Sequence, residues 1–255
     1  MENIILEFEH VTGNYGQFRL EDIHFSLPAG YIMALIGNNG AGKTTLIKYI
    51  MEEKNKYEGT IRIGGTDIRE NHAYMKNKIG FVSDENPFLL DRTAEQNAQI
   101  LGIFYEDFDM DLFRESMKNM GLSPKKVYGK MSRGETMKFQ VAFAMAHHSV
   151  IYLLDEVTAG MDPVFRIDFF KILQDVIKDE TASVLMISHI ESEVERKTDY
   201  VGIMENGKFW CQYGYHTGAE TGQGGIRWIR SFMIKNNSRF WMPSLRSFSP
   251  GVQKM

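Results

Sequence analysis

A glycine-rich stretch of eight residues carries the clearest chemical signal in the sequence. Residues 37–44 read Gly-Asn-Asn-Gly-Ala-Gly-Lys-Thr and fit the pattern G-x-x-x-x-G-K-[ST] at every position. Glycines let the backbone wrap around a phosphate chain and aim its N–H groups inward. The stretch therefore predicts a nucleoside triphosphate site, with a chance glycine turn as the alternative. The residues expected to line this site are Asn38, Gly40, Ala41, Gly42, Lys43, Thr44 and Thr45.

Within this stretch, Lys43 and Thr44 have distinct expected roles. The Lys43 ammonium is expected to reach the β- and γ-phosphates, where it acts in catalysis as well as in binding. The Thr44 hydroxyl is expected to bind Mg²⁺. The flanking sequence supports this interpretation, because an apolar run ends at Ile36 and a helical pattern begins near Thr44.

Two adjacent acids, Asp155 and Glu156, follow the apolar run of residues 151–154. Ionised carboxylates rarely stand at the end of an apolar strand without a cation or a shared proton. Asp155 is suited to hold Mg²⁺, and Glu156 is suited to polarise an attacking water. A merely solvated strand end is the alternative, and the nearby phosphate-loop pattern favours the chemical interpretation.

Strand and helix patterns alternate along the chain and predict an α/β core with a parallel sheet. A mostly helical block over residues 88–135 interrupts the alternation and predicts an inserted helical subdomain. The expected strands are residues 4–9 (at a sheet edge), 18–27, 31–36, 60–63, 151–154, 184–187 and 201–204. The expected helices are residues 44–51, much of 93–121, 133–147 and 164–177.

The composition sets further limits. The chain has 255 residues, one cysteine and a formal net charge of −4, which excludes an internal disulfide and does not suggest a nucleic-acid partner. No run approaches 18 apolar residues, and the first ten residues do not resemble a signal peptide. We expect one domain over residues 1–212. We expect residues 213–255 to be an atypical basic tail, with a disordered end, a reading-frame artefact or contact with anionic lipid as the alternatives.

Beyond the phosphate loop, the chain resembles the ABC transporter ATPase family from about residue 4 to residue 208. Residues 131–135, Met-Ser-Arg-Gly-Glu, are similar to the family signature L-S-G-G-Q. Residues 155–163 are similar to the run D-E-P-T-S-G-L-D-P, which places Asp162 in the family's D-loop. Tyr15 resembles the aromatic that stacks on adenine, and His189 resembles the switch histidine.

This resemblance implies a P-loop NTPase core with a mostly parallel sheet, an antiparallel β edge and the helical insertion. It also implies an ATPase that uses ATP and Mg²⁺ and drives a separate membrane permease at the inner face of the membrane. Two ATPase subunits would sandwich two ATP molecules, in a homo- or heterodimer, and Ser132 and Gly134 of one would contact the γ-phosphate held by the other. His189 would hold the geometry of the attacking water, and Phe88, Leu89 and Leu90 would face the permease.

Several residues depart from the family pattern. Arg133 replaces a signature glycine, and Glu135 replaces the signature glutamine. Asp84 stands where the family has the Q-loop glutamine, and its carboxylate can still bind Mg²⁺. The variation is similar to bacterial exporter-type subunits. The alternative is a non-transport or hydrolysis-deficient ABC ATPase that acts as a regulatory or binding subunit. We also expect His147 and His148 to end a helix as positive charges.

Overall fold

A computed structural model describes residues 3–52, 56–85, 87–158, 161–188 and 197–214, with the side chains of 211–214 not described. The predicted His189 therefore lies outside the described residues. The chain divides into two compact units, Met1–Gln212 and Tyr213–Met255. Nearly all of the second unit is outside the described residues, so the fold below is that of the first. None of the described helices is long and apolar enough to span a bilayer.

Ten strands and six α-helices make up the described part of the chain. The strands are β1 (Ile4–Tyr15), β2 (Phe18–Pro28), β3 (Ile32–Ile36), β4 (Tyr57–Ile63), β5 (Thr66–Asp67), β6 (Ile79–Val82), β7 (Ile151–Asp155), β8 (Ser183–Ile187), β9 (Tyr200–Glu205) and β10 (Lys208–Gly214). The helices are α1 (Lys43–Met51), α2 (His72–Asn77), α3 (Ala94–Gly102), α4 (Met110–Asn119), α5 (Arg133–Ala146) and α6 (Pro163–Ile177), with one 3₁₀ turn, η1 (Tyr128–Lys130).

The smaller sheet has the strand order β2-β1-β4-β5, and its neighbouring strands are antiparallel. β1 therefore lies inside the sheet between β2 and β4, and the expectation that residues 4–9 form an edge strand is wrong. The burial of Leu6 and Phe8 explains the error. Alternation along a strand reports which face is covered, but it does not report whether the strand has one neighbour or two.

The larger sheet has the strand order β10-β9-β3-β8-β7-β6, and β6, β7, β8, β3 and β9 are joined by parallel pairs. Every residue of β3 and β8 is buried, as expected for central strands covered on both faces. The carboxyl ends of parallel strands lie along one edge of a sheet. The loop after β3, the segment after β6 that contains Asp84, and the acids at the end of β7 therefore lie along that edge.

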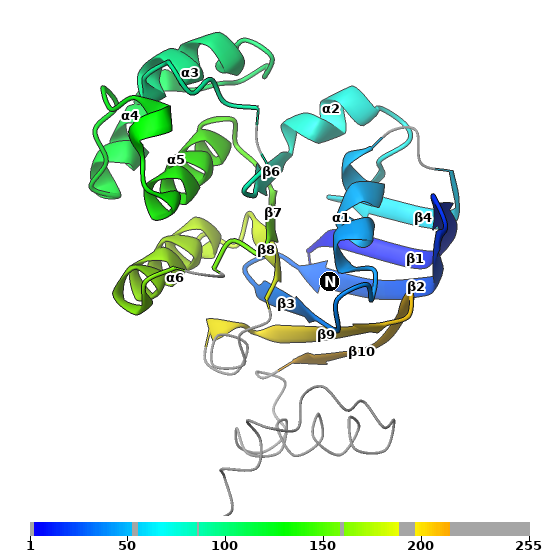
Figure 1. The fold of residues 1–255 in the computed structure, drawn as a ribbon. Coiled ribbons are helices and arrows are strands. Elements are labelled where there is room, and N and C mark those ends of the chain that lie inside the picture. Colours follow the sequence, from blue (N-terminus) through cyan, green and yellow to red (C-terminus); the bar gives the residue numbers. More distant parts are fainter. Residues whose placement is uncertain (1–2, 53–55, 86, 159–160, 189–196, 215–255) are drawn as a thin grey trace, which may run out of the picture. The chain divides into compact units, whose positions relative to one another are not determined.

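The helices α3, α4 and α5 form a helical part beyond β6 and β7, away from the antiparallel sheet (Figure 1). Aromatic side chains pack it together, and Phe88 meets Phe139 edge to face with ring centroids 4.7 Å apart. The ring cluster consists of Phe88, Phe108, Phe113, Tyr128, Phe139 and Phe143. Because α5 runs to Ala146, the predicted boundary at residue 135 falls inside this helix.

Candidate functional site

The phosphate loop joins buried strand β3 to helix α1, as the sequence pattern requires. Gly42 precedes the helix with φ 108°, a conformation that residues with a side chain rarely adopt. A Cβ atom at this position would lie 2.8 Å from the Phe18 ring and 3.0 Å from the Leu20 side chain. The hairpin of β1 and β2 therefore presses directly on the loop. Gly42 is fixed both by backbone conformation and by this close approach.

Lys43 is buried at the base of the loop, with 5% of its surface exposed. Its Nζ donates hydrogen bonds to the carbonyl oxygens of Gly37 (2.8 Å) and Asn38 (3.0 Å). Burial lowers the pKa of Lys43, while the nearby charges of Glu156 and Asp155 raise it. The ammonium is thus held inside the loop by weak acceptors, which the oxygens of a phosphate can replace with stronger, charge-assisted bonds.

Thr44 and Asp155 meet across the site, although 111 residues separate them in sequence. The Thr44 hydroxyl donates to Oδ1 of Asp155 at 3.4 Å. Burial raises the pKa of Asp155, and the charge of Glu156 raises this pKa further. A divalent cation relieves both effects, so this pair of oxygen donors fits Mg²⁺. Among the described residues, no group of three or more acids, histidines or cysteines forms a metal cage, but Mg²⁺ usually takes one or two protein ligands beside phosphates and water.

Glu156 projects an exposed side chain from the end of β7, next to the buried Val157. Its φ of 53° lies in the left-handed region, which costs a residue other than glycine roughly 1–2 kcal/mol. The surrounding contacts must hold this conformation, and such strain is concentrated at functional sites. One contact is from Arg133, whose Nη2 donates to the Glu156 carbonyl at 3.3 Å.

The signature-like segment begins α5 with Ser132 as its N-cap. The Ser132 side chain accepts from the Glu135 backbone N–H, while the Glu135 carboxylate accepts from the Ser132 N–H. Lys126 also donates to Glu135 at 2.7 Å, and this hydrogen bond is the main cause of the lowered pKa of Glu135. Glutamate is therefore a competent replacement for the family glutamine. It closes a capping box and leaves the Ser132 hydroxyl exposed at the positive end of a helix.

Gly134 has a packing role that sequence inspection missed. A Cβ atom on Gly134 would lie 2.6 Å from the ring of Phe165, in the first turn of α6. The predicted contact of Gly134 with a phosphate stays a prediction. The structure shows in addition that this glycine allows α5 and α6 to approach closely. No pattern near either residue in the sequence signals this contact, because 31 positions separate Gly134 from Phe165.

The two departures at residues 84 and 133 pair with each other. Arg133 Nε donates to Oδ1 of Asp84 at 2.9 Å, and Arg133 Nη2 donates to Oδ2 at 2.7 Å. The two residues are 49 positions apart in sequence, so the pattern of either one gave no sign of the pair. Both oxygens of Asp84 are thus engaged by a guanidinium in this state. Mg²⁺ binding by Asp84, suggested by the resemblance, stays a prediction.

Tyr15 and Asp162 each contact residues outside the phosphate loop. Tyr15 ends β1, its hydroxyl donates to Glu52 at 3.1 Å, and Lys48 Nζ lies 5.2 Å from its ring centroid. Asp162 caps α6 by accepting from the N–H groups of Val164 (2.9 Å) and Phe165 (3.3 Å). The roles of Tyr15 at adenine and of Asp162 in the D-loop stay predictions.

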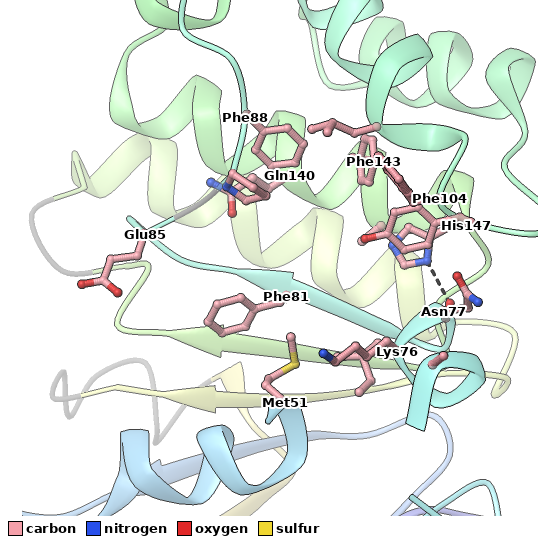
Figure 2. Close-up of a pocket in the computed structure, with 16 residues that line it drawn as sticks. Met51, Lys76, Asn77, Phe81, Glu85, Phe88, Phe104, Gln140, Phe143 and His147 are labelled. Atoms are coloured by element: carbon pink, nitrogen blue, oxygen red, sulfur yellow. Dashed lines mark hydrogen bonds between the residues drawn. The ribbon is translucent and has the colours of Figure 1, made fainter. Parts of the chain in front are cut away.

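A cavity of about 530 Å³ separates the helical part from the parallel sheet (Figure 2). Phe81 and Met51 line it from the core, and Phe88, Phe104 and Phe143 line it from the helical part. We call this cavity the interdomain groove. Its lining is mostly apolar, whereas the phosphate loop is surrounded by charges. The groove is therefore suited to an apolar segment of a partner and unsuited to a nucleotide.

His147 lies at the end of α5 on the wall of the groove, and the expectation of a positive charge there is wrong. It is buried, its ring stacks on Tyr105 at 4.1 Å, and its Nδ1 lies 3.0 Å from the Asn77 carbonyl oxygen (Figure 2). Burial lowers the pKa of His147 to about 4, so the ring is neutral at pH 7. The sequence showed the helix end correctly, but it did not show the aromatic cover.

Comparisons with known proteins agree with this geometry. The family model described as ABC transporter matches residues 20–159. The bacitracin transport ATP-binding protein BcrA of Enterococcus faecalis is 29% identical, over 80% of this chain and 67% of its own length. The ATP-binding protein YtrB of Bacillus subtilis is 30% identical, over 73% of this chain and 64% of its own. The chain thus spans about two thirds of the length of these relatives.

A solved structure supports the fold. A dimeric ATP-binding cassette with ADP and phosphate bound superposes with a TM-score of 0.71 at 18% identity, covering 82% of this chain and 98% of the other. Because the family model covers more than half of the sequence, the chain belongs to the ABC transporter family. It is an ATP-binding subunit of the ATPase class, and the predicted P-loop NTPase fold is confirmed.

Proposed function

We propose that this chain hydrolyses ATP with Mg²⁺ at the phosphate loop and so drives a separate membrane permease from the inner face of the membrane. The observation that carries the proposal is the convergence of Lys43, Thr44, Asp155 and Glu156 at one sheet edge. These four side chains supply a phosphate contact, two oxygen ligands for Mg²⁺ and a general base, which is the set that hydrolysis of a phosphoanhydride needs.

The residues divide the work as follows. Lys43 exchanges its loop carbonyls for the β- and γ-phosphate oxygens and neutralises part of their charge. Thr44 and Asp155 hold Mg²⁺, which supplies charge stabilisation for the phosphates when it is bound. Glu156 orients a water and accepts its proton as the oxygen attacks the γ-phosphorus, and ADP leaves with the β-phosphate oxygen. Tyr15 supports the adenine, and His189 holds the water.

A second ATPase subunit completes the site in this proposal. The Ser132 hydroxyl and the first N–H groups of α5 are at an exposed helix N-terminus, which favours an anion. Ser132 and Gly134 of one subunit would therefore contact the γ-phosphate of the ATP bound by the other, with Asp162 near the same interface. A homodimer should form from this chain alone with ATP, whereas a heterodimer requires a different ATPase subunit.

The permease partner is supported by the interdomain groove. Phe104, at its wall, exposes 74% of its surface, and Leu90, close by in sequence to the lining residues Pro87 and Phe88, exposes 69%. Exposed apolar side chains beside an apolar hollow suit a short helix of a membrane protein. Phe88 is a poorer test position than the sequence suggested, because its ring packs on Tyr128, Phe139 and Phe143 and its loss would disturb the helical part.

A substitution at the groove tests the permease contact. Phe104→Ala should reduce the stimulation of ATPase activity by the co-purified permease and leave basal activity unchanged. The matched control is Ile167→Ala on α6, which is also an exposed apolar residue but lies outside the groove. An equal loss of basal and stimulated activity in Phe104→Ala would contradict the assignment.

The relative named for bacitracin transport suggests a peptide antibiotic as the class of transported substrate. This substrate class is a proposal about the assembled transporter, since the permease rather than the ATPase contacts the cargo. Deletion of the gene should increase sensitivity to such peptides in the source cell. Unchanged sensitivity across a panel of peptide antibiotics would remove this substrate class and leave the ATPase proposal intact.

Trapping the nucleotide-bound dimer tests the motor itself. Wild-type protein and Glu156→Gln are each incubated with Mg²⁺ and ATP, and mass and bound nucleotide are measured by light scattering and chromatography. We expect wild type to release ADP and the variant to retain ATP as a dimer. If wild type neither hydrolyses nor dimerises, the alternative holds, and the chain is a regulatory or binding subunit.

A further inference from the structure

Arg133 connects three parts of the molecule that must be aligned for the proposed ATP hydrolysis: helix α5, the segment after β6 and the segment after β7. It is the first residue of α5, its guanidinium grips Asp84 with two hydrogen bonds, and it also donates to the Glu156 carbonyl. Asp84 follows β6 and Glu156 follows β7, which are adjacent parallel strands. One side chain of the helical part thus spans the ends of two core strands at the ATP site.

The stability of the fold does not explain this placement. The side chains of Arg133 and Asp84 are 36% and 61% exposed, and exposed ion pairs usually contribute only about 0–1 kcal/mol. A cation at the first position of a helix is also opposed by the helix dipole. What the pair does provide is orientation, because a two-point fork fixes the plane of the guanidinium and therefore the direction of its remaining N–H groups.

A second contact from the same helix fixes the Asp84 segment. Gln140 lies seven residues, or two turns, after Arg133 and is buried. Its side-chain oxygen accepts from the Ser83 N–H and its nitrogen donates to the Ser83 carbonyl, both at 3.0 Å. These two hydrogen bonds resemble those that a neighbouring β-strand would make with the Ser83 backbone. The segment of Ser83 and Asp84 is therefore held at two points along one face of α5, and Asp84 is a fixed support for Arg133.

Arg133, held in this way, restrains the backbone of Glu156. Its left-handed φ of 53° is strained, and the hydrogen bond from Arg133 to its carbonyl restrains the peptide that follows it. The next residue, Val157, is fully buried and anchors the other side of the peptide. Relaxation would turn the Glu156 carboxylate away from the phosphate loop and from the water it activates.

We propose that Arg133, held by Asp84, is a positioning residue that locks the Glu156 backbone and so aims its carboxylate at the attacking water. This assignment rests on the proposed function, in which Glu156 is the general base. It gives the two departures from the family pattern a joint role within one subunit: the pair keeps the site competent for hydrolysis.

The test compares Arg133→Lys and Asp84→Asn with wild type in steady-state ATP hydrolysis. Lysine at position 133 keeps the positive charge but cannot form the two parallel hydrogen bonds to Asp84. Asparagine at position 84 removes the negative charge that binds the Arg133 guanidinium. We expect either variant to lower kcat about tenfold to a hundredfold, as a small misplacement of a catalytic group does. For Arg133→Lys, KM for ATP should stay within about twofold of wild type, because this substitution alters neither the phosphate loop nor a predicted Mg²⁺ ligand. The double variant should be no slower than the slower single variant, because the two residues act as a unit.

The control is Arg114→Lys, which removes a similar exposed fork, to Glu95 and Asp111, from the helical part. It should leave kcat unchanged, and all variants should melt close to wild type. A readout specific to positioning comes from the Glu156→Gln background. There, adding Arg133→Lys should change the residual rate by less than about twofold and leave the ATP-trapped dimer intact.

Two results would overturn the assignment. The first is an unchanged kcat in Arg133→Lys. The second is loss of the trapped dimer in the variant that combines Arg133→Lys with Glu156→Gln, which would place Arg133 at the neighbouring subunit's nucleotide instead. Failure of the proposed function is distinguishable from both, because wild type itself would then show no hydrolysis that depends on Glu156.

Discussion

The phosphate loop and the helical part differ in how far apart in sequence the residues that shape them lie. In the loop, eight consecutive residues fix the geometry, because glycines set the backbone and Lys43 bonds to carbonyls only five and six positions away. In the helical part, the important contacts join residues that are far apart in sequence, such as Arg133 with Asp84 and Gln140 with Ser83. A contiguous pattern therefore predicts the first region well and the second poorly.

This contrast predicts that substitutions in the two regions have different effects. The largest expected effect is a loss of stability when a residue of the ring cluster is substituted. Phe139 is fully buried and packs on Phe88, Tyr128 and Phe113. Phe139→Ala should reduce the free energy of unfolding by about 3–5 kcal/mol, since it leaves a cavity that the neighbouring rings cannot fill. Chemical denaturation measures this loss. The folded variant should still bind nucleotide, because the loop lies outside the cluster, and a loss below about 1 kcal/mol would show that the cluster is not the core of the helical part.

In the loop, substitution should affect chemistry and leave the fold nearly unchanged. Lys43→Ala should lower kcat/KM for ATP about a hundredfold or more, because it removes the cation that neutralises the transferred phosphate. The fold should tolerate the change, since the ammonium bonds only to loop carbonyls and burial already lowers its pKa. Lys171→Ala, an exposed lysine on α6, is the control for charge. Hydrolysis by Lys43→Ala at the wild-type rate would contradict the site.

The pH dependence of stability separates the two regions further. Burial lowers the pKa of His147 to about 4, below the ordinary value of 6.5, and the charges of His148 and Lys78 act in the same direction. Above pH 6.5 the His147 ring is mainly neutral in both the folded and the unfolded chain, so its contribution to the free energy of unfolding is fully present. As the pH falls from 6.5 towards 4, the unfolded chain binds a proton that the folded chain does not, so about 1.4 kcal/mol is lost per pH unit.

Urea denaturation between pH 4 and pH 7.5 measures this slope. His147→Gln should flatten it, whereas His148→Asn should not, because His148 is exposed and asparagine tolerates its left-handed conformation. An unchanged slope in His147→Gln would mean that other groups carry the dependence.

The success of prediction from sequence follows the same division. The strand, loop and helix around Lys43 and the carboxylates at the end of β7 were predictable, because short-range patterns specify them. The capping role of Ser132 was also predictable from its position. By contrast, α2 and β6 were not assigned, since each is short, with six and four residues. The neutral state of His147 and the contact of Gly134 with Phe165 depend on neighbours from other elements. No local pattern reports such contacts.

The central claim is that Glu156 acts as a general base on Mg²⁺-bound ATP beside Lys43. The most direct measurement is the rate of phosphate release from saturating ATP by purified wild type and Glu156→Gln, each with Mg²⁺ and with excess chelator. The account predicts steady turnover only by wild type with Mg²⁺, and a rate at least about a hundredfold lower for the variant. Equal rates for the two proteins, or turnover by wild type that does not depend on Mg²⁺, would contradict it.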